Sequence, residues 1–282
     1  MPGFTDRKVC RFPAQSSGID NLAIEEPLEF RIQGEPLLIT MRTPGHDVEL
    51  AAGFCLTEGI IEHADELDHV ESCSLANYGN VVLITLSESA YLQFRHKASA
   101  RKREFFMSSS CGICGSQTIE HLSRNYPKAT THFTVSEQVL HQLPSQMCLE
   151  QESFVRTGGI HAAAYFTTEG VLCHLREDVG RHNAVDKVIG ALLLNGQLPA
   201  PPGIMLVSGR TSYEVAQKCL SAGISFLASI GAPSSLAYDI ACQTGMTLVG
   251  FLRDGRFNVY YDCGRIRAGN QHPQPVIEHP FQ

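Results

Sequence analysis

Residues 203–251 have the sequence GIMLVSGRTSYEVAQKCLSAGISFLASIGAPSSLAYDIACQTGMTLVGF, and this stretch decides the fold. Three short apolar runs alternate with two longer stretches that begin at serine and end near glycine. Apolar strands that alternate with helices of this length are typical of a parallel sheet covered on its faces by helices. The stretch therefore predicts three strands and two helices, namely Gly203–Val207, Ser212–Ala222, Ile224–Ser229, Ser234–Gln243 and Met246–Phe251.

The flanking sequence extends this α/β pattern on both sides. Gly159–Phe166 and Val171–Leu175 indicate a pair of strands, and Arg181–Leu194 is an apolar-striped helix that stops at Gly196. A further helix is expected to begin at Ser136. Phe257–Tyr261 is expected to form an edge strand. The second half of the chain thus predicts one layered α/β unit.

The first half of the chain predicts a smaller α+β unit with the order ββαββ. Two strands, Glu29–Ile32 and Leu37–Met41, turn at Gln33-Gly34-Glu35, which is a hairpin signal. A helix over Val48–Thr57 is expected to be capped by Asp47. Two more strands are expected at Val70–Cys73 and Val81–Leu86, with a turn at 77–80 between them.

Changes in composition predict four segments along the chain. Residues 20–105 form the α+β domain, 106–130 a connector, 131–264 the α/β domain and 265–282 a loose, proline-rich tail. The basic stretch Gln93–Ser110 is expected to be exposed and to lead into the connector, where a helix is expected over Ser116–Arg124.

Overall composition excludes several classes of protein. The 282 residues carry a formal net charge of −7, which argues against nucleic-acid binding because that requires a surplus of Lys and Arg. No apolar run approaches the roughly 20 residues that cross a bilayer, and Met1–Ser17 does not have the pattern of a signal peptide. We therefore expect no membrane partner, a cytoplasmic location and reduced thiols.

The connector holds the one close cysteine pair, Cys111-Gly112-Ile113-Cys114. A structural zinc site needs a second ligand pair, and no other Cys-x-x-Cys exists in the chain. A thioredoxin-like site needs a βαβ setting that is missing here. A nucleophilic thiol that carries sulfur remains, because Ser108–Ser110 offers an exposed approach. An inert buried pair is the alternative that the residues alone leave open.

Polar segments follow several of the expected strands. Because ligands bind at the carboxyl ends of strands in open α/β sheets, these segments are expected to meet at one edge and to form a pocket for a large phosphorylated ligand. Several also have a purely structural explanation. The block at Glu177 could be a helix capped by Asp178 with Asp186 and Lys187 in solvent, His161 could be a structural histidine, and the segment 251–256 could be a solvated hairpin. The four segments are Glu177–Lys187, Val207–Ser212, Gly231–Ser235 and Phe251–Arg256, and Gly158–Ala164 adds His161 on an expected strand.

Taken together, these motifs resemble the formate dehydrogenase accessory sulfurtransferase family (FdhD/NarQ-like). The similarity runs from about Ile24 to Tyr261, and the block that begins at Glu177 is the most specific part. The matching stretches are Ser109–Gly115, Thr157–Ala164, Glu177–Gly190, Ser208–Arg210, Ser234–Ala237 and Gly250–Arg256.

The resemblance implies a fold and a reaction. It implies that the second domain is a three-layer, cytidine-deaminase-like α/β domain without the catalytic zinc, and that the protein is a homodimer with no structural metal. It implies that Cys111 accepts persulfide sulfur from a cysteine desulfurase, with Cys114 as relay partner. The sulfur then passes to the molybdenum (or tungsten) bis-guanine-dinucleotide cofactor, Mo-bis(molybdopterin guanine dinucleotide), which serves formate dehydrogenase.

The cofactor-binding residues follow from the resemblance and from the polar segments. The guanine dinucleotide is expected at the segment 251–256, and the remaining contacts at the ends of the neighbouring strands. The expected residues are Phe251, Leu252, Arg253, Asp254, Gly255, Arg256, His161, Arg181, His182, Ser208, Gly209 and Arg210. The competing hypothesis is a non-catalytic chaperone that holds the cofactor with the same residues and performs no sulfur chemistry.

Overall fold

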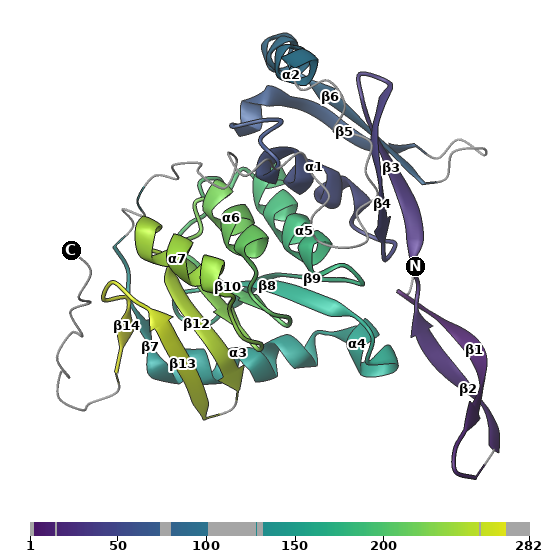
Figure 1. The fold of residues 1–282 in the computed structure, drawn as a ribbon, viewed down its shortest axis with the longest axis vertical. Coiled ribbons are helices and arrows are strands. Elements are labelled where there is room, and N and C mark those ends of the chain that lie inside the picture. The colour runs from purple at the N-terminus through teal and green to yellow at the C-terminus, as the bar shows by residue number, and fades with distance from the viewer. Residues whose placement is uncertain are drawn as a thin grey trace.

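A six-stranded mixed sheet forms the centre of the larger part of the molecule (Figure 1). The computed structural model describes residues 3–14, 16–73, 80–100, 128, 132–253 and 255–268. The strand order is β13-β12-β11-β10-β8-β9; β10, β11 and β12 are parallel, and the other neighbours are antiparallel. The strands are β8 (His161–Thr167), β9 (Leu172–Asp178), β10 (Gly203–Val207), β11 (Phe226–Ser229), β12 (Thr247–Arg253) and β13 (Arg256–Tyr261).

Helices cover both faces of this sheet, as Figure 1 shows. The helices α5 (Arg181–Leu194), α6 (Tyr213–Ser221) and α7 (Ser235–Thr244) lie on one face, while α3 (Glu137–Leu149) and the short α4 (Glu152–Thr157) lie on the other. β10 is buried along its whole length because its alternate side chains enter two different cores, Met205 on the α5 side and Ile204 on the α3 side. The predicted mixed α/β fold is confirmed, whereas the likeness to cytidine deaminases stays a prediction.

The smaller unit has the predicted ββαββ order. Its sheet has the order β4-β3-β6-β5, in which β3 pairs antiparallel with β4 and parallel with β6. The elements are β3 (Glu26–Ile32), β4 (Glu35–Arg42), α1 (Asp47–Thr57), the 3-10 turn η1 (Ala64–Glu66), β5 (Leu67–Cys73) and β6 (Val81–Leu86). The hairpin turn at Gln33 and Gly34 is confirmed, while the turn expected at 77–80 lies largely outside the described residues.

Helices α1 and α5 lie side by side and join the two units (Figure 1). Two glycines permit this approach. A Cβ atom at Gly190 of α5 would lie 1.8 Å from the carbonyl oxygen of Glu49, and a Cβ atom at Gly53 of α1 would lie 1.9 Å from that of Asp186. Since no side chain fits at either position, the two helix backbones touch directly. One hydrophobic core then runs continuously through both units.

Three elements differ from the sequence-based expectation. Helix α2 (Glu88–Ala100) includes residues 93–100 of the stretch Gln93–Ser110 that was expected to be an exposed connector, and its Tyr91 and Phe94 pack against the core. A hairpin of β1 (Phe4–Arg11) and β2 (Ser16–Ala23) was not predicted; it projects from the body in Figure 1. The start of the expected loose tail contains β14 (Ile266–Arg267), which pairs with β7 (Val135–Ser136).

The residues at the helix N-termini agree with the expectation for three helices and differ for α1. Ser136, Ser212 and Ser234, at which helices were expected to begin, each accept a hydrogen bond from the backbone N–H three residues later. The Asp47 cap was wrong. His46 is the N-cap residue of α1, in a left-handed conformation, and the Asp47 carboxylate instead accepts two hydrogen bonds from the buried Arg42 guanidinium.

The division of the chain at residues 105, 130 and 264 stays a prediction. The connector, including its expected helix Ser116–Arg124, lies almost entirely outside the described residues. Among the described helices, none combines the length and the apolar character that crossing a membrane requires.

Candidate functional site

Two strand ends meet at the edge of the central sheet. Because β8 and β10 are antiparallel, the start of β8 lies beside the end of β10. Backbone hydrogen bonds continue past the strand, since the Ser208 N–H donates to the Ala162 carbonyl at 2.9 Å. In return the Ala162 N–H donates to Ser208 Oγ, also at 2.9 Å. His161 and Ser208, which are 47 positions apart in the sequence, thus come to the same edge.

Gly209 brings the N-terminus of α5 into this edge. A Cβ atom at Gly209 would lie 3.4 Å from His161 Nδ1 and 3.9 Å from Arg181 Cβ, so the three residues are immediate neighbours. Burial lowers the pKa of His161, as do the neighbouring Arg181 and His182, while Asp178 opposes them. His161 is therefore a neutral imidazole at pH 7, with one nitrogen that donates and one that accepts a hydrogen bond.

The loops after β11 and β12 continue the same edge. The Gly231 N–H donates to the Gly209 carbonyl at 3.2 Å, and the Phe251 N–H donates to the Gly231 carbonyl at 3.0 Å. Phe251 adopts a φ of 53°, which is uncommon for a bulky residue and costs free energy, and the residue is 39% exposed. Residues with a strained backbone conformation of this kind cluster at active sites and ligand-binding sites.

The remaining residues of the 251–256 segment lie on the β12–β13 hairpin. Leu252 is fully buried against the core beneath α3, so its side chain is not available to a ligand in this structure. Arg253 and Arg256 pair across the hairpin and are exposed. Neither they nor Arg210 form an ion pair with a described residue, so three guanidinium groups are available to an anion. Cys111, Cys114 and Asp254 lie outside the described residues.

His182 contacts two polar groups at the start of α6. Its Nε2 lies 3.4 Å from Ser212 Oγ and 3.5 Å from Glu214 Oε2, and Ser212 Oγ donates to the same Glu214 oxygen at 2.8 Å. The hydrogen bond from His182 lowers the pKa of Glu214. The carboxylate fixes the orientation of this imidazole beside Arg181 at the site edge.

A pocket of about 590 Å³ opens below this edge, between the sheet and the helices α3 and α4. Its walls are mainly apolar, with four side chains that are polar or carry a thiol: Cys148, Gln151, His161 and Ser208. Gln151 is only 4% exposed, and its Nε2 has no hydrogen-bond partner among the described residues. The other lining residues are Pro144, Met147, Phe154, Gly158, Gly159, Ile160 and Ile230.

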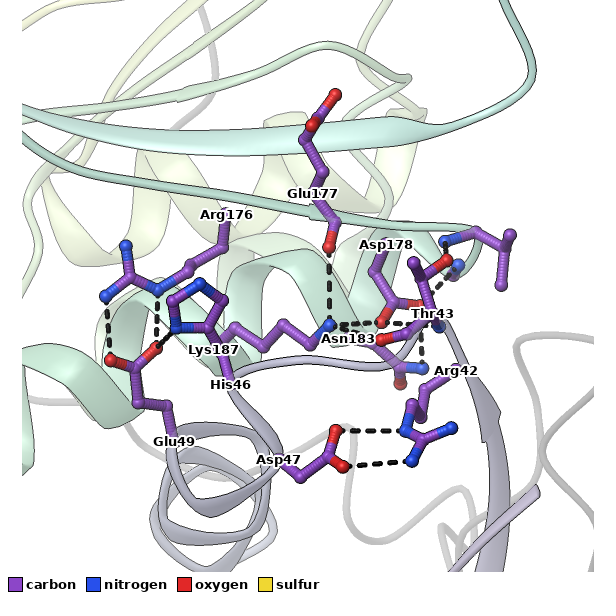
Figure 2. A network of polar contacts seen from close by, with 12 residues as sticks. Arg42, Thr43, His46, Asp47, Glu49, Arg176, Glu177, Asp178, Asn183 and Lys187 are labelled. Carbon is purple, nitrogen blue, oxygen red and sulfur yellow. Dashed lines mark hydrogen bonds and ion pairs between the residues drawn. The ribbon is translucent and has the colours of Figure 1, made fainter. Parts of the chain in front are cut away.

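Figure 2 shows the polar network that holds the base of the site. The Lys187 ammonium forms a 2.8 Å ion pair with Asp178, and it also donates to the Thr43 carbonyl at 2.8 Å. Asp178 further accepts hydrogen bonds from the backbone N–H groups of Gly180 and Thr43. Burial raises the pKa of Asp178, which Lys187 and the hydrogen bonds from Gly180 and Asn183 oppose. The network therefore ties the N-terminus of α5 to the smaller unit.

This network corrects two expectations. Asp178 does not cap α5, because the N-cap residue is Gly180 and Asp178 is occupied with Lys187 and Thr43. Asp186 and Lys187 are not solvated, since both are almost fully buried. Asp186 forms a second buried ion pair with Lys218 at 2.9 Å, and Lys218 also pairs with Glu58 from the end of α1. The polar residues of this block are thus largely structural, apart from Arg181 and His182.

Sequence reasoning missed several residues around the site. Gln151 and Cys148 stand in no recognisable motif, and their role as pocket walls depends on how α3 and α4 pack against the sheet. Glu177 was assigned only to a polar block, yet its carboxylate accepts hydrogen bonds from the N–H groups of Ser153 and Phe154 and so fixes the start of α4. The described residues contain no group of three or more His, Cys, Asp or Glu that is arranged to hold a metal ion.

Comparisons with known proteins give the family. The FdhD/NarQ family model matches residues 23–267. A protein of Streptomyces avermitilis described as sulfur carrier protein FdhD is 45% identical over 275 residues, covering 92% of this chain and 94% of the relative. A protein of Sulfurisphaera tokodaii with the same description is 46% identical over 250 residues, covering 88% and 92%.

A solved structure supports the fold. It belongs to a protein of Desulfotalea psychrophila that is described as a candidate formate dehydrogenase accessory protein, and it superposes with a TM-score of 0.73. The match covers 94% of this chain and 98% of the other at 24% sequence identity. With a family model that spans nearly the whole chain and relatives at 45% identity, the chain belongs to the FdhD/NarQ family.

Proposed function

We propose that this protein carries sulfur during the maturation of formate dehydrogenase, with Cys111 as the persulfide carrier. The observation that supports this most is the 45% identity to relatives described as sulfur carrier proteins, over nearly the full length of both chains. The sequence supplies a close thiol pair, Cys111 and Cys114, after a serine-rich stretch.

The proposed transfer is a pair of exchange reactions. The Cys111 thiolate attacks the outer sulfur of a persulfide on a cysteine desulfurase; the S–S bond of the donor breaks, and the donor leaves as a thiolate. Cys114 then attacks the outer sulfur of the Cys111 persulfide in the same way and takes it over, which frees Cys111 for the next cycle. Each step forms one S–S bond and breaks one, so no oxidant is required.

The acceptor in this proposal is the molybdenum bis-guanine-dinucleotide cofactor, which is cargo that the protein delivers in the cytoplasm. The edge of the central sheet supports this assignment, because it combines the exposed guanidinium groups of Arg210, Arg253 and Arg256 with a large, mainly apolar pocket. Guanidinium groups suit the phosphates of a dinucleotide, and an apolar pocket suits its rings. We propose a homodimer as the working form.

The decisive experiment is to map the sulfur. Wild-type protein is incubated with a cysteine desulfurase and cysteine, and peptide mass analysis is expected to find one added sulfur atom on Cys111. Cys111→Ala should lose both this adduct and the formate dehydrogenase activity of cells that lack their own copy of the protein. Cys173→Ala, an exposed cysteine on β9, is the matched control and should retain both.

An adduct mapped to a cysteine other than Cys111 and Cys114, or an adduct on Cys114 that persists in Cys111→Ala, would overturn the assignment of Cys111. Formate dehydrogenase activity that survives the loss of both Cys111 and Cys114 would instead favour the chaperone hypothesis, in which the protein holds the cofactor and performs no sulfur chemistry.

A further inference from the structure

The N-terminus of α5 lacks the local features that usually stabilise the start of a helix. Its N-cap residue is Gly180, which offers no side chain for a cap, and its first turn holds no acidic residue. The helix begins instead with Arg181 and His182. A cation such as Arg181 is unfavourable at the positive end of the helix dipole. Contacts from outside the helix must therefore hold this turn, which carries two of the residues expected to bind the cofactor.

Thr43 of the smaller unit binds the turn before α5 with all three of its polar atoms (Figure 2). Its N–H donates to Asp178 Oδ2 at 3.2 Å, and its Oγ1 accepts a hydrogen bond from the Val179 N–H, also at 3.2 Å. Its carbonyl oxygen accepts a hydrogen bond from the Lys187 ammonium at 2.8 Å. Because Thr43 is only 3% exposed, water does not compete for these bonds.

A second contact with the smaller unit supports the first. Asn183, in the first turn of α5, donates from Nδ2 to the Met41 carbonyl at 2.8 Å. Met41 and Thr43 lie on either side of Arg42, whose buried guanidinium donates two hydrogen bonds to the Asp47 carboxylate. The end of β4 is thus itself held in place, so it gives the start of α5 a fixed position.

Other contacts join α5 to the smaller unit further along the helix. Gly190 touches the backbone of α1, and Asp186 accepts a hydrogen bond from Thr57 of α1 at 2.8 Å. The bonds of Thr43 act at a different place, on the turn that precedes the helix. They therefore determine the direction in which Arg181 and His182 extend from the edge of the sheet.

We propose that Thr43 is a positioning residue, through which the smaller unit holds Arg181 and His182 at the edge of the central sheet. The proposal rests on the proposed function, because it takes the guanine-dinucleotide cofactor as the ligand of these two side chains. Side chains that are held in place before a ligand arrives lose little freedom when it binds. The affinity for the ligand therefore depends on Thr43, although Thr43 does not touch the ligand.

The test compares three substitutions in the full-length protein. Thr43→Val removes the hydroxyl that binds the Val179 N–H and keeps the shape of the side chain, whereas Thr43→Ser keeps the hydroxyl. Thr57→Val is the matched control. Thr57 is 1% exposed, lies on the contact between the same two units and loses a hydroxyl that binds Asp186. Both valine variants should lower the melting temperature to a similar extent.

Two measurements separate positioning from stability. Guanosine diphosphate, a probe for the nucleotide part of the proposed cargo, should bind Thr43→Val about tenfold more weakly than wild type. It should bind Thr43→Ser and Thr57→Val as it binds wild type. Amide hydrogen exchange of residues 178–184 should accelerate in Thr43→Val but not in these two variants. Asn183→Ala removes the contact with Met41 and should repeat both effects, so the test does not depend on a single variant.

The proposal is overturned if Thr43→Val binds guanosine diphosphate as well as wild type does, if Thr57→Val loses as much affinity, or if Thr43→Ser does not bind like wild type. Wild-type protein that does not bind the probe would overturn both this proposal and the proposed cargo. The sulfur chemistry fails separately. Full binding of the probe without any sulfur adduct on Cys111 would contradict the sulfur-carrier role and leave the role of Thr43 intact.

Discussion

The positions of some residues at the site could be predicted from the sequence, and those of others could not. His161, Ser208 and Gly209 were expected to meet because they flank strand ends, and the structure brings them within contact distance. Lys187 was expected in solvent because charged residues usually are, but it is buried beside Asp178. A sequence shows that a charge is present, whereas its burial depends on which distant backbone groups reach it, here the Thr43 carbonyl.

Glu49 carries a pH-dependent contribution to stability. Burial alone would raise its pKa, but hydrogen bonds from Arg176 and His46 lower it from 4.5 to about 2 (Figure 2). A lowered carboxyl pKa stabilises the fold above the unfolded value, and this stability is lost as the pH falls from 4.5 toward 2. The stability difference between wild type and Glu49→Gln should thus be largest at neutral pH and shrink over that range.

Urea unfolding of both proteins at a series of pH values measures this difference. Glu71→Gln is a suitable control, since Glu71 is exposed and its carboxylate forms an ion pair only with the exposed His69 among the described residues. A difference between wild type and Glu49→Gln that stays constant from pH 7 to the acid limit would show that the contact with Arg176 contributes nothing.

At the scale of elements, the local sequence predicted most helices and strands of the α/β unit, because residues next to each element mark where it begins and ends. The serine caps before α3, α6 and α7 and the apolar runs of β10 to β12 are local signals. Helix α2 was misread because Arg95 and Lys97 obscured the spacing of Tyr91 and Phe94. The hairpin β1–β2 has little apolar alternation, so no strand was expected there.

The close contact between α1 and α5 predicts that a side chain at Gly190 destabilises the protein. Gly190→Ala places a methyl group where a backbone oxygen already lies, so the helices must separate, and we expect a loss of at least about 3 kcal/mol in the free energy of unfolding. Gly159→Ala is the control, because the nearest atom to its Cβ would lie 3.8 Å away. Chemical denaturation measures both, and equal stability of the two variants would contradict the close packing described here.

At the scale of the whole molecule, the two units share one core. Leu28, Phe30 and Val82 from the smaller sheet belong to the same apolar cluster as Val185 and Ile189 of α5. The sequence suggested two units because the pattern changes from ββαββ to alternating strands and helices. It contained no signal that their cores would merge, since that depends on the helix contact between them.

A shared core implies cooperative folding. Residues 24–100 produced alone should fail to fold, because α1 would expose the face that packs on α5. Rapid digestion by trypsin and a featureless near-ultraviolet circular dichroism spectrum are the expected observations, while the full chain should unfold in a single transition. A protease-resistant 24–100 fragment would show instead that the smaller unit is independent.

The two glycines of the α1–α5 contact also fix the register of one helix against the other. If α5 slid along α1 by about one turn, Asp186 or Leu194 would replace Gly190 opposite the Glu49 carbonyl, and either side chain would collide with it. Only one register of the two helices is therefore sterically allowed. The ion pairs that cross between the units, such as Glu49 with Arg176 and Glu58 with Lys218, depend on that register. The absence of two methyl groups thus determines how the charged partners are aligned.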